Sequence, residues 1–85
     1  MDIDDITYII NGAVFEVNKV LGSGFLEKVY ENALVVEMRK QGLKVEAQKP
    51  IAVSYKGESI GDYFADLLVE DKVIIELKTV ERLDN

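Results

Sequence analysis

Two stretches at the start of the chain carry apolar residues at the three- and four-residue steps of an α-helix. The first runs from Ile3 to Leu21, and Asp2 or Asp4 can cap its start. After the break Gly22-Ser23-Gly24, a second helix runs up to Gly42, a residue typical of a left-handed helix end. The inward-facing positions that this period predicts are Ile3, Ile6, Ile9, Ile10, Ala13, Val14, Val17, Val20 and Leu21 in the first helix, and Leu26, Val29, Tyr30, Ala33, Leu34 and Met38 in the second.

Beyond Gly42 the period of the apolar residues falls from about 3.6 to 2, which is typical of β-strands. A first strand is expected at residues 45–55, and Pro50 within it predicts an edge strand or a bulge at that point. A second strand is expected from about Ser59 to Val69 and a third from Val73 to Val80, with short polar turns between them. The sequence therefore predicts one α+β domain, residues 1–85, with two N-terminal helices followed by a three-stranded antiparallel meander.

The composition narrows the possible chemistry. The chain has no cysteine and no histidine, so disulfides and the usual zinc ligands are excluded. Any metal has to be bound by oxygen, which favours magnesium, manganese or calcium. The acidic start does not have the order of a secretory signal, and no apolar run approaches the roughly 20 residues that span a bilayer. We therefore expect a cytoplasmic protein with no membrane segment.

The formal net charge of −6 counts against a protein that coats nucleic acid with lysine and arginine. It leaves open an enzyme whose carboxylates recruit metal ions to a phosphodiester. A chain this short also has a thin core, so self-association would help to stabilise it.

The third predicted strand, VIIELKTV, contains two charges on one face. Glu76 and Lys78 are two residues apart in an otherwise apolar run. Burying such ions costs several kcal/mol each unless they are compensated. Three compensations are open at this point: a cross-strand salt bridge, a sheet edge open to water, or a metal ion with a substrate phosphate.

The register of the last two strands decides which group lies beside these charges. If Val69 faces Val73 across a three-residue loop, Asp66 lies directly opposite Glu76. A two-residue loop would place the two carboxylates on opposite faces of the sheet. A loop shifted by one residue would place Asp66 opposite Lys78. Two of the three registers therefore gather Asp66, Glu76 and Lys78 into one cluster.

Carboxylates about 5 Å apart across a ladder repel each other. A divalent cation between Asp66 and Glu76 would turn that repulsion into a binding site, because each carboxylate offers a hard oxygen ligand. Lys78 would then stand beside an attacking water or a phosphate oxygen. An ion-pair hairpin with a solvated face is the plain alternative.

The start of the second helix adds a motif. Gly24, Glu27 and Tyr30 spell G-x-x-E-x-x-Y in GFLEKVYENAL. Glu27 lies in the first turn, where the helix dipole favours an anion, and Tyr30 follows on the same face. Taken alone, these residues read as helix capping and a core tyrosine. The chain, however, resembles the GxxExxY protein family of the PD-(D/E)XK nuclease superfamily from about Ile10 to Leu83, through VLGSGFLEKVYENAL, KVEAQKPIAVSYKG and YFADLLVEDKVIIELKTVERL.

The resemblance implies a restriction-endonuclease-like core and a nuclease that cleaves DNA with Mg²⁺ or Mn²⁺. Asp66 and Glu76, with Glu27, would bind the metal, and Lys78 would position or activate water for in-line attack. Tyr30 matches the family tyrosine beside the helix acid. The matches also include two departures, since relatives commonly carry histidine at the position of Asn18 and some carry proline at the position of Ala65.

The family pattern continues beyond the glutamate-lysine strand into a further helix and closing strands, whereas this sequence stops at Asn85. We therefore expect a truncated core that is part of a longer protein or is covered by a second copy in a homodimer. The alternative function is a catalytically inactive nuclease-fold remnant that acts as a dimerising or partner-binding module.

Overall fold

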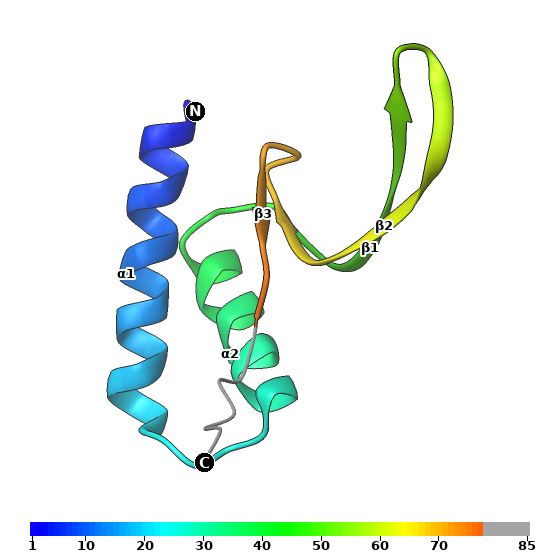
Figure 1. Ribbon diagram of the computed structural model, residues 1–85. Helices are drawn as coiled ribbons and strands as arrows, with labels where there is room; N and C mark the ends of the chain where they lie inside the picture. Colours follow the sequence, from blue (N-terminus) through cyan, green and yellow to red (C-terminus); the bar gives the residue numbers. More distant parts are fainter. Residues whose placement is uncertain (78–85) are drawn as a thin grey trace, which may run out of the picture.

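The computed structural model describes residues 1–77 and confirms the predicted order of elements. The strands form one antiparallel sheet in the order β1-β2-β3, so the α+β meander is confirmed. The two helices lie side by side next to the lower part of the sheet (Figure 1). The elements are α1, Ile3–Leu21; α2, Glu27–Lys40; β1, Val45–Tyr55; β2, Glu58–Val69; and β3, Val73–Ile75.

The helix ends form where the sequence predicts them. Asp2 caps α1 by accepting a hydrogen bond from the amide of Asp5 at 2.9 Å. Gly22 closes α1 with a left-handed φ of 71°. Gly42 follows α2 with a φ of 91°, and this conformation suits glycine because it has no Cβ. Neither helix of residues 1–77 has the length and hydropathy that crossing a membrane requires.

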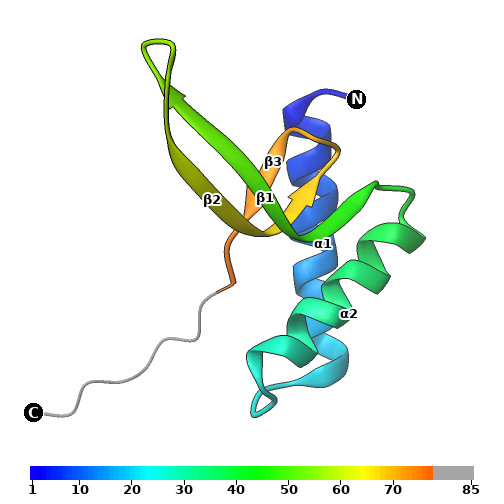
Figure 2. The ribbon, with the colours of Figure 1, turned by 90° about the vertical axis from the view of Figure 1, so that its right-hand side faces the viewer.

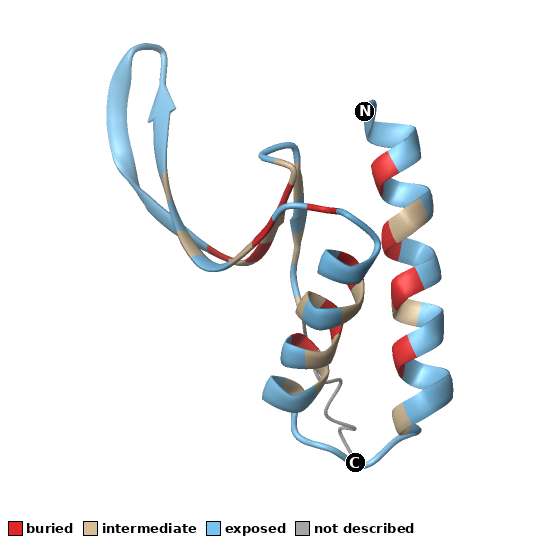
Figure 3. Ribbon diagram, turned by 180° about the vertical axis from the view of Figure 1, so that it is seen from behind, coloured by how far each residue is buried: buried red, intermediate tan, exposed pale blue. Residues whose placement is uncertain are grey.

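The hydrophobic core lies between the facing sides of α1 and α2 and the base of the sheet (Figure 3). Its most deeply buried large side chains are Ile6, Met38, Leu67 and Val69, each fully inaccessible. Four side chains predicted to face inward, Ile3, Val20, Leu26 and Val29, are exposed instead. The last three lie near the turn that joins the helices, at the end of the helix pair away from the sheet (Figure 1). The buried cluster comprises Ile6, Ile10, Ala13, Val17, Leu34, Met38, Leu43, Val45, Leu67 and Val69.

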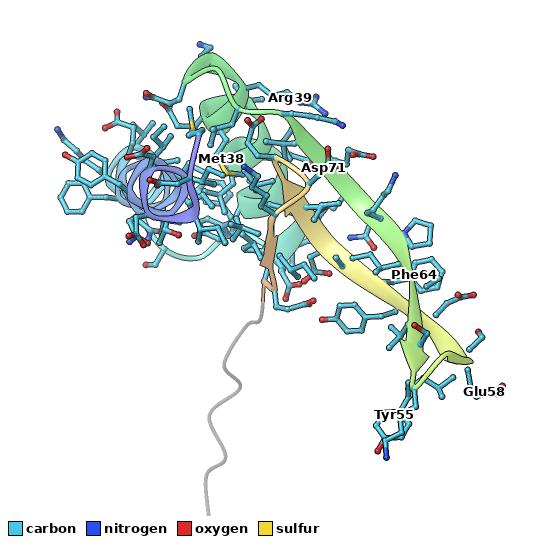
Figure 4. The ribbon with its side chains drawn as sticks, turned by 90° about the horizontal axis from the view of Figure 1, so that it is seen from above. Met38, Arg39, Tyr55, Glu58, Phe64 and Asp71 are labelled. Carbon is cyan, nitrogen blue, oxygen red and sulfur yellow. The ribbon has the colours of Figure 1, made fainter. Side chains whose placement is uncertain are left out.

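Beyond this base, β1 and β2 continue as a two-stranded hairpin that projects from the helices (Figures 1 and 2). We call residues 50–64 the arm. Where the arm meets the rest of the sheet, burial changes between two neighbouring residues of β2. Ala65 is fully buried, whereas Phe64 is 64 % exposed. Figure 4 shows Phe64 along the arm and Tyr55 near its tip. The exposed large apolar side chains of the arm are Val53, Tyr55, Ile60, Tyr63 and Phe64.

Strand β1 is an edge strand, as predicted, but its distortion lies elsewhere. Pro50 pairs regularly with Phe64, whereas Gln48 adopts a left-handed φ of 53° and interrupts the ladder. The register is the same on both sides of Gln48, and it shifts only further along, between Val53 and Ser54. The proline removes a donor that an edge strand does not need, so it can be accommodated without a bulge.

Strand β3 is shorter than predicted. The sequence predicted a strand from Val73 to Val80, and the structure ends it at Ile75. The amide of Leu77 donates to the side-chain Oδ2 of Asp66 at 2.7 Å. In a longer β3 this amide would be available to a backbone carbonyl of β2, so the side chain of Asp66 takes the place of a backbone acceptor. Residues 78–80 lie outside the described part of the chain.

Candidate metal centre

Asp66 lies in β2, and Glu76 follows directly after the last residue of β3. The ladder pairs Val69 with Val73 and Leu67 with Ile75, which selects the first of the three registers that the sequence left open. Continued by one residue, this register sets Asp66 against Glu76. Because side chains alternate along a strand, the burial of Leu67 against the helices turns Asp66 toward the opposite face. Glu76 is exposed.

Each of the two carboxylates accepts a hydrogen bond through one of its oxygens. The amide of Leu77 donates to Asp66 Oδ2 at 2.7 Å, and the hydroxyl of Tyr63 donates to Glu76 Oε1. The other oxygens, Asp66 Oδ1 and Glu76 Oε2, accept no hydrogen bond from residues 1–77. Two fixed carboxylates therefore each present one oxygen that no other group of the described chain uses.

Tyr63 is a member of this cluster that the sequence did not reveal. Its hydrogen bond to Glu76 raises the pKa of the phenol, as do loss of solvation and the charges of Glu76 and then Asp66. A phenol is protonated at neutral pH even at its ordinary pKa of about 10, so the hydroxyl is the donor of this bond. Strand alternation predicts that Tyr63 faces away from Asp66, but β2 bends sharply where the arm meets the base of the sheet (Figure 2). This bend gave no signal in the sequence.

The donor set fits a hard divalent cation of the size of Mg²⁺. Magnesium usually binds one or two carboxylates and completes its shell with water and substrate phosphate. Asp66 and Glu76 supply such a pair. Among residues 1–77 no group of three acidic side chains is close enough to hold a metal ion, so Glu27 does not join the pair in the described structure. Lys78, the predicted partner of the attacking water, lies outside the described residues.

The remaining residues of the G-x-x-E-x-x-Y motif lie at the connection between α1 and α2. Gly24 has a φ of 105°, which favours glycine. The Tyr30 hydroxyl donates to the carbonyl of Gly22 at 2.6 Å and accepts from the amide of Phe25 at 3.3 Å. The rings of Phe25 and Tyr30 meet edge to face with centroids 6.1 Å apart. Glu27 begins α2, in the first turn as predicted, and is half-buried.

Another acidic residue of α2 is buried, and its burial was not predicted from the sequence. Glu31 is only 4 % exposed. Its Oε2 lies 2.5 Å from Lys28 Nζ, and its Oε1 accepts from Gln48 Nε2 at 2.9 Å. A signal for it existed, because Glu31 stands at helical spacing from the buried residues Leu34 and Met38.

The partner of Glu31, Gln48, lies in β1 beside the strand that carries Asp66. Gln48 lies across from Asp66, between the ladder pairs Ala47–Leu67 and Lys49–Ala65. A non-glycine residue in the left-handed region costs on the order of 1–3 kcal/mol and persists where other contacts hold it. The hydrogen bond to Glu31 is such a contact.

The comparison with known proteins gives one match. A family model described as the PD-(D/E)XK nuclease superfamily matches residues 4–85. This range includes Asp66, Glu76 and the start of α2. No curated protein matches the chain significantly, and no solved structure does. The finer GxxExxY assignment stays a prediction.

Proposed function

Because the chain belongs to the PD-(D/E)XK nuclease superfamily, we propose that it is a Mg²⁺-dependent nuclease that hydrolyses DNA phosphodiester bonds. The observation that carries the proposal is the pair formed by Asp66 and Glu76. The β2–β3 register, continued by one residue beyond β3, sets the two carboxylates against each other, and each is held through one oxygen while no group of residues 1–77 uses the other.

In this proposal Asp66 and Glu76 would hold Mg²⁺ or Mn²⁺. Glu27, the third ligand that the family resemblance implies, is not part of that pair among residues 1–77. When bound there, the ion would supply positive charge that stabilises the transition state at phosphorus and would lower the pKa of water. Lys78, two residues beyond Glu76, orients the attacking water. The attacking water gives up one proton to solvent as its oxygen forms a bond to phosphorus, the bond from phosphorus to the leaving sugar oxygen breaks, and that oxygen takes up a proton from solvent.

The charge of the protein supports a requirement for the cation. A chain with a formal net charge of −6 repels a phosphodiester, and two carboxylates at the point of reaction add to the repulsion. Binding of DNA at this face should therefore depend on the metal ion. The cysteine-free composition agrees with the cytoplasm as the proposed compartment.

The test is cleavage of supercoiled plasmid and of end-labelled oligonucleotides with Mg²⁺, with Mn²⁺ and with EDTA. We expect Asp66→Asn and Glu76→Gln to lower the rate at least about a hundredfold, since losing even an outer partner of a ligand costs about 10–100-fold. Asp62→Asn is the matched control, because Asp62 is an exposed carboxylate of the same strand. Equal rates for the wild type, Asp66→Asn and Glu76→Gln would refute the nuclease proposal, as would a wild type without activity.

A second candidate function is a dimerising or partner-binding module that has lost catalysis. The arm favours it, because Tyr55, Ile60 and Phe64 expose 59 %, 63 % and 64 % of their surface, and exposed apolar clusters mark interaction sites. A homodimer formed through the arm predicts a sedimentation coefficient that rises with concentration and falls back in Phe64→Ser. A monomer at all concentrations would exclude the homodimer.

A further inference from the structure

Tyr63 is the only side chain of residues 1–77 that donates a hydrogen bond to Glu76. It comes from the arm, where it pairs across the ladder with Ile51, and it is 42 % exposed. The position is unusual for a tyrosine whose function is packing. Its ring lies outside the buried cluster, so its hydroxyl is its main connection to the rest of the site.

The bond determines which oxygen of Glu76 remains available. A carboxylate on a flexible side chain can rotate and present either oxygen to a cation, and it loses conformational entropy when the cation fixes it. In this chain the phenol holds Oε1. Oε2 has no hydrogen-bond partner among residues 1–77, and Asp66 is itself held by the amide of Leu77.

Tyr63 and Asp66 also lie three residues apart in the same strand. The strand therefore positions one ligand directly, through Asp66, and the other indirectly, through the phenol. Ligating carboxylates are generally oriented by outer hydrogen-bond partners, and these partners raise metal affinity by limiting the rotation of the ligand.

We propose that Tyr63 is a positioning residue of the metal centre, which binds Glu76 Oε1 so that Oε2 is directed at the cation. This inference rests on the proposed function. It assigns a role to a residue outside the acidic and lysine positions that define the predicted site. A tyrosine that only stabilised the arm would affect the free energy of unfolding and leave the affinity for metal unchanged.

The decisive variant is Tyr63→Phe, which removes the hydroxyl and keeps the ring. Tyr55→Phe is the matched control, because Tyr55 is an exposed tyrosine of the same arm, and its ring contacts Lys56. The primary measurement is calorimetric titration of the DNA-free protein with Mn²⁺. We expect Tyr63→Phe to weaken Mn²⁺ binding about 10–100-fold and Tyr55→Phe to leave it unchanged. Urea unfolding without metal measures any structural effect of either change separately.

A second readout separates positioning from catalysis. In cleavage assays Tyr63→Phe should raise the Mg²⁺ concentration at half-maximal rate by a similar factor. The maximal rate at saturating Mg²⁺ should stay close to that of the wild type, because the hydroxyl acts on the ligand and not on the reacting atoms.

The outcomes distinguish this inference from the proposed function. If the wild type binds Mn²⁺ and Glu76→Gln abolishes the binding, but Tyr63→Phe binds with wild-type affinity, the positioning role is refuted and the nuclease proposal stands. If the wild type binds no Mn²⁺, or binds it independently of Glu76, the metal centre itself is refuted, and the inference fails with it.

Discussion

Glu31 and Glu76 show two different uses of one side chain in the same small protein. Glu31 is 4 % exposed, and both of its oxygens are taken, by Lys28 and by Gln48. Glu76 is exposed, and residues 1–77 occupy only its Oε1, through Tyr63. A carboxylate whose acceptors are all satisfied inside the fold contributes to stability, whereas one with an oxygen left over can bind a ligand.

The largest expected difference between the two glutamates is in stability. Glu31→Ala removes a charged acceptor and leaves the Gln48 amide without its partner, so we expect a loss of about 2–3 kcal/mol in the free energy of unfolding. Glu76→Ala removes one hydrogen bond at the surface and should cost less than about 1 kcal/mol. Urea unfolding followed by circular dichroism measures both values. Equal losses would mean that burial does not separate the two carboxylates.

A smaller effect tests how Glu31 holds its partner. In Gln48→Ala and Gln48→Gly the hydrogen bond to Glu31 is lost equally, but only glycine relieves the left-handed φ of 53°. We expect the glycine variant to be more stable than the alanine variant by about 1 kcal/mol. The neighbouring Ala47 has no positive φ, so Ala47→Gly should show the opposite sign and destabilise by up to about 1 kcal/mol. If glycine were less stable than alanine at both positions, the free energies of unfolding would contradict backbone strain at Gln48.

The smallest effect concerns a third kind of carboxylate, an exposed one in an ion pair. Lys44 Nζ lies 3.0 Å from Asp71 Oδ2, and the hydrogen bond and charge of Lys44 lower the pKa of Asp71. A lowered pKa stabilises the fold at pH values above the unfolded-state pKa, and this contribution disappears as the pH falls through the folded-state pKa. Lys44→Met should therefore reduce stability slightly at neutral pH and leave it unchanged at low pH.

Urea midpoints between pH 7 and pH 2 measure this difference. Asp71→Asn is the companion variant, because it removes the same pair from the other side and should show the same dependence on pH. A loss in Lys44→Met that grows toward low pH would contradict this assignment.

The sequence predicted the part of the site that depends on local pattern. The apolar ends of β2 and β3 and the short polar turn between them limited the register to three choices, and the one that sets Asp66 against Glu76 is confirmed. The glycines at the helix ends were equally predictable, because their left-handed conformations follow from residue type. The role of Lys78 stays a prediction.

The residues that sequence analysis missed depend on contacts distant in the chain. Gln48 reaches Glu31 from 17 positions away, and nothing near Gln48 indicates a left-handed backbone. Glu31 was overlooked because an acid on a helix is usually solvated. Strict alternation along β2 would turn the side chain of Tyr63 to the face away from Glu76. Tyr63 reaches Glu76 because β2 bends where the arm meets the base of the sheet.

The projecting arm has a consequence for how the molecule opens. None of the described helices covers it, and an isolated two-stranded hairpin is only marginally stable in water. The protection of backbone amides against hydrogen exchange should therefore change along β2 near Ala65. Amides of the arm should exchange through local opening, whereas those of Leu67 and Val69 should exchange only when the whole protein unfolds. Uniform protection along β2 would argue against this division. Because Tyr63 belongs to the arm and Asp66 to the base, the boundary between the two cooperative units passes through the candidate metal centre, which is complete only while the hairpin is closed.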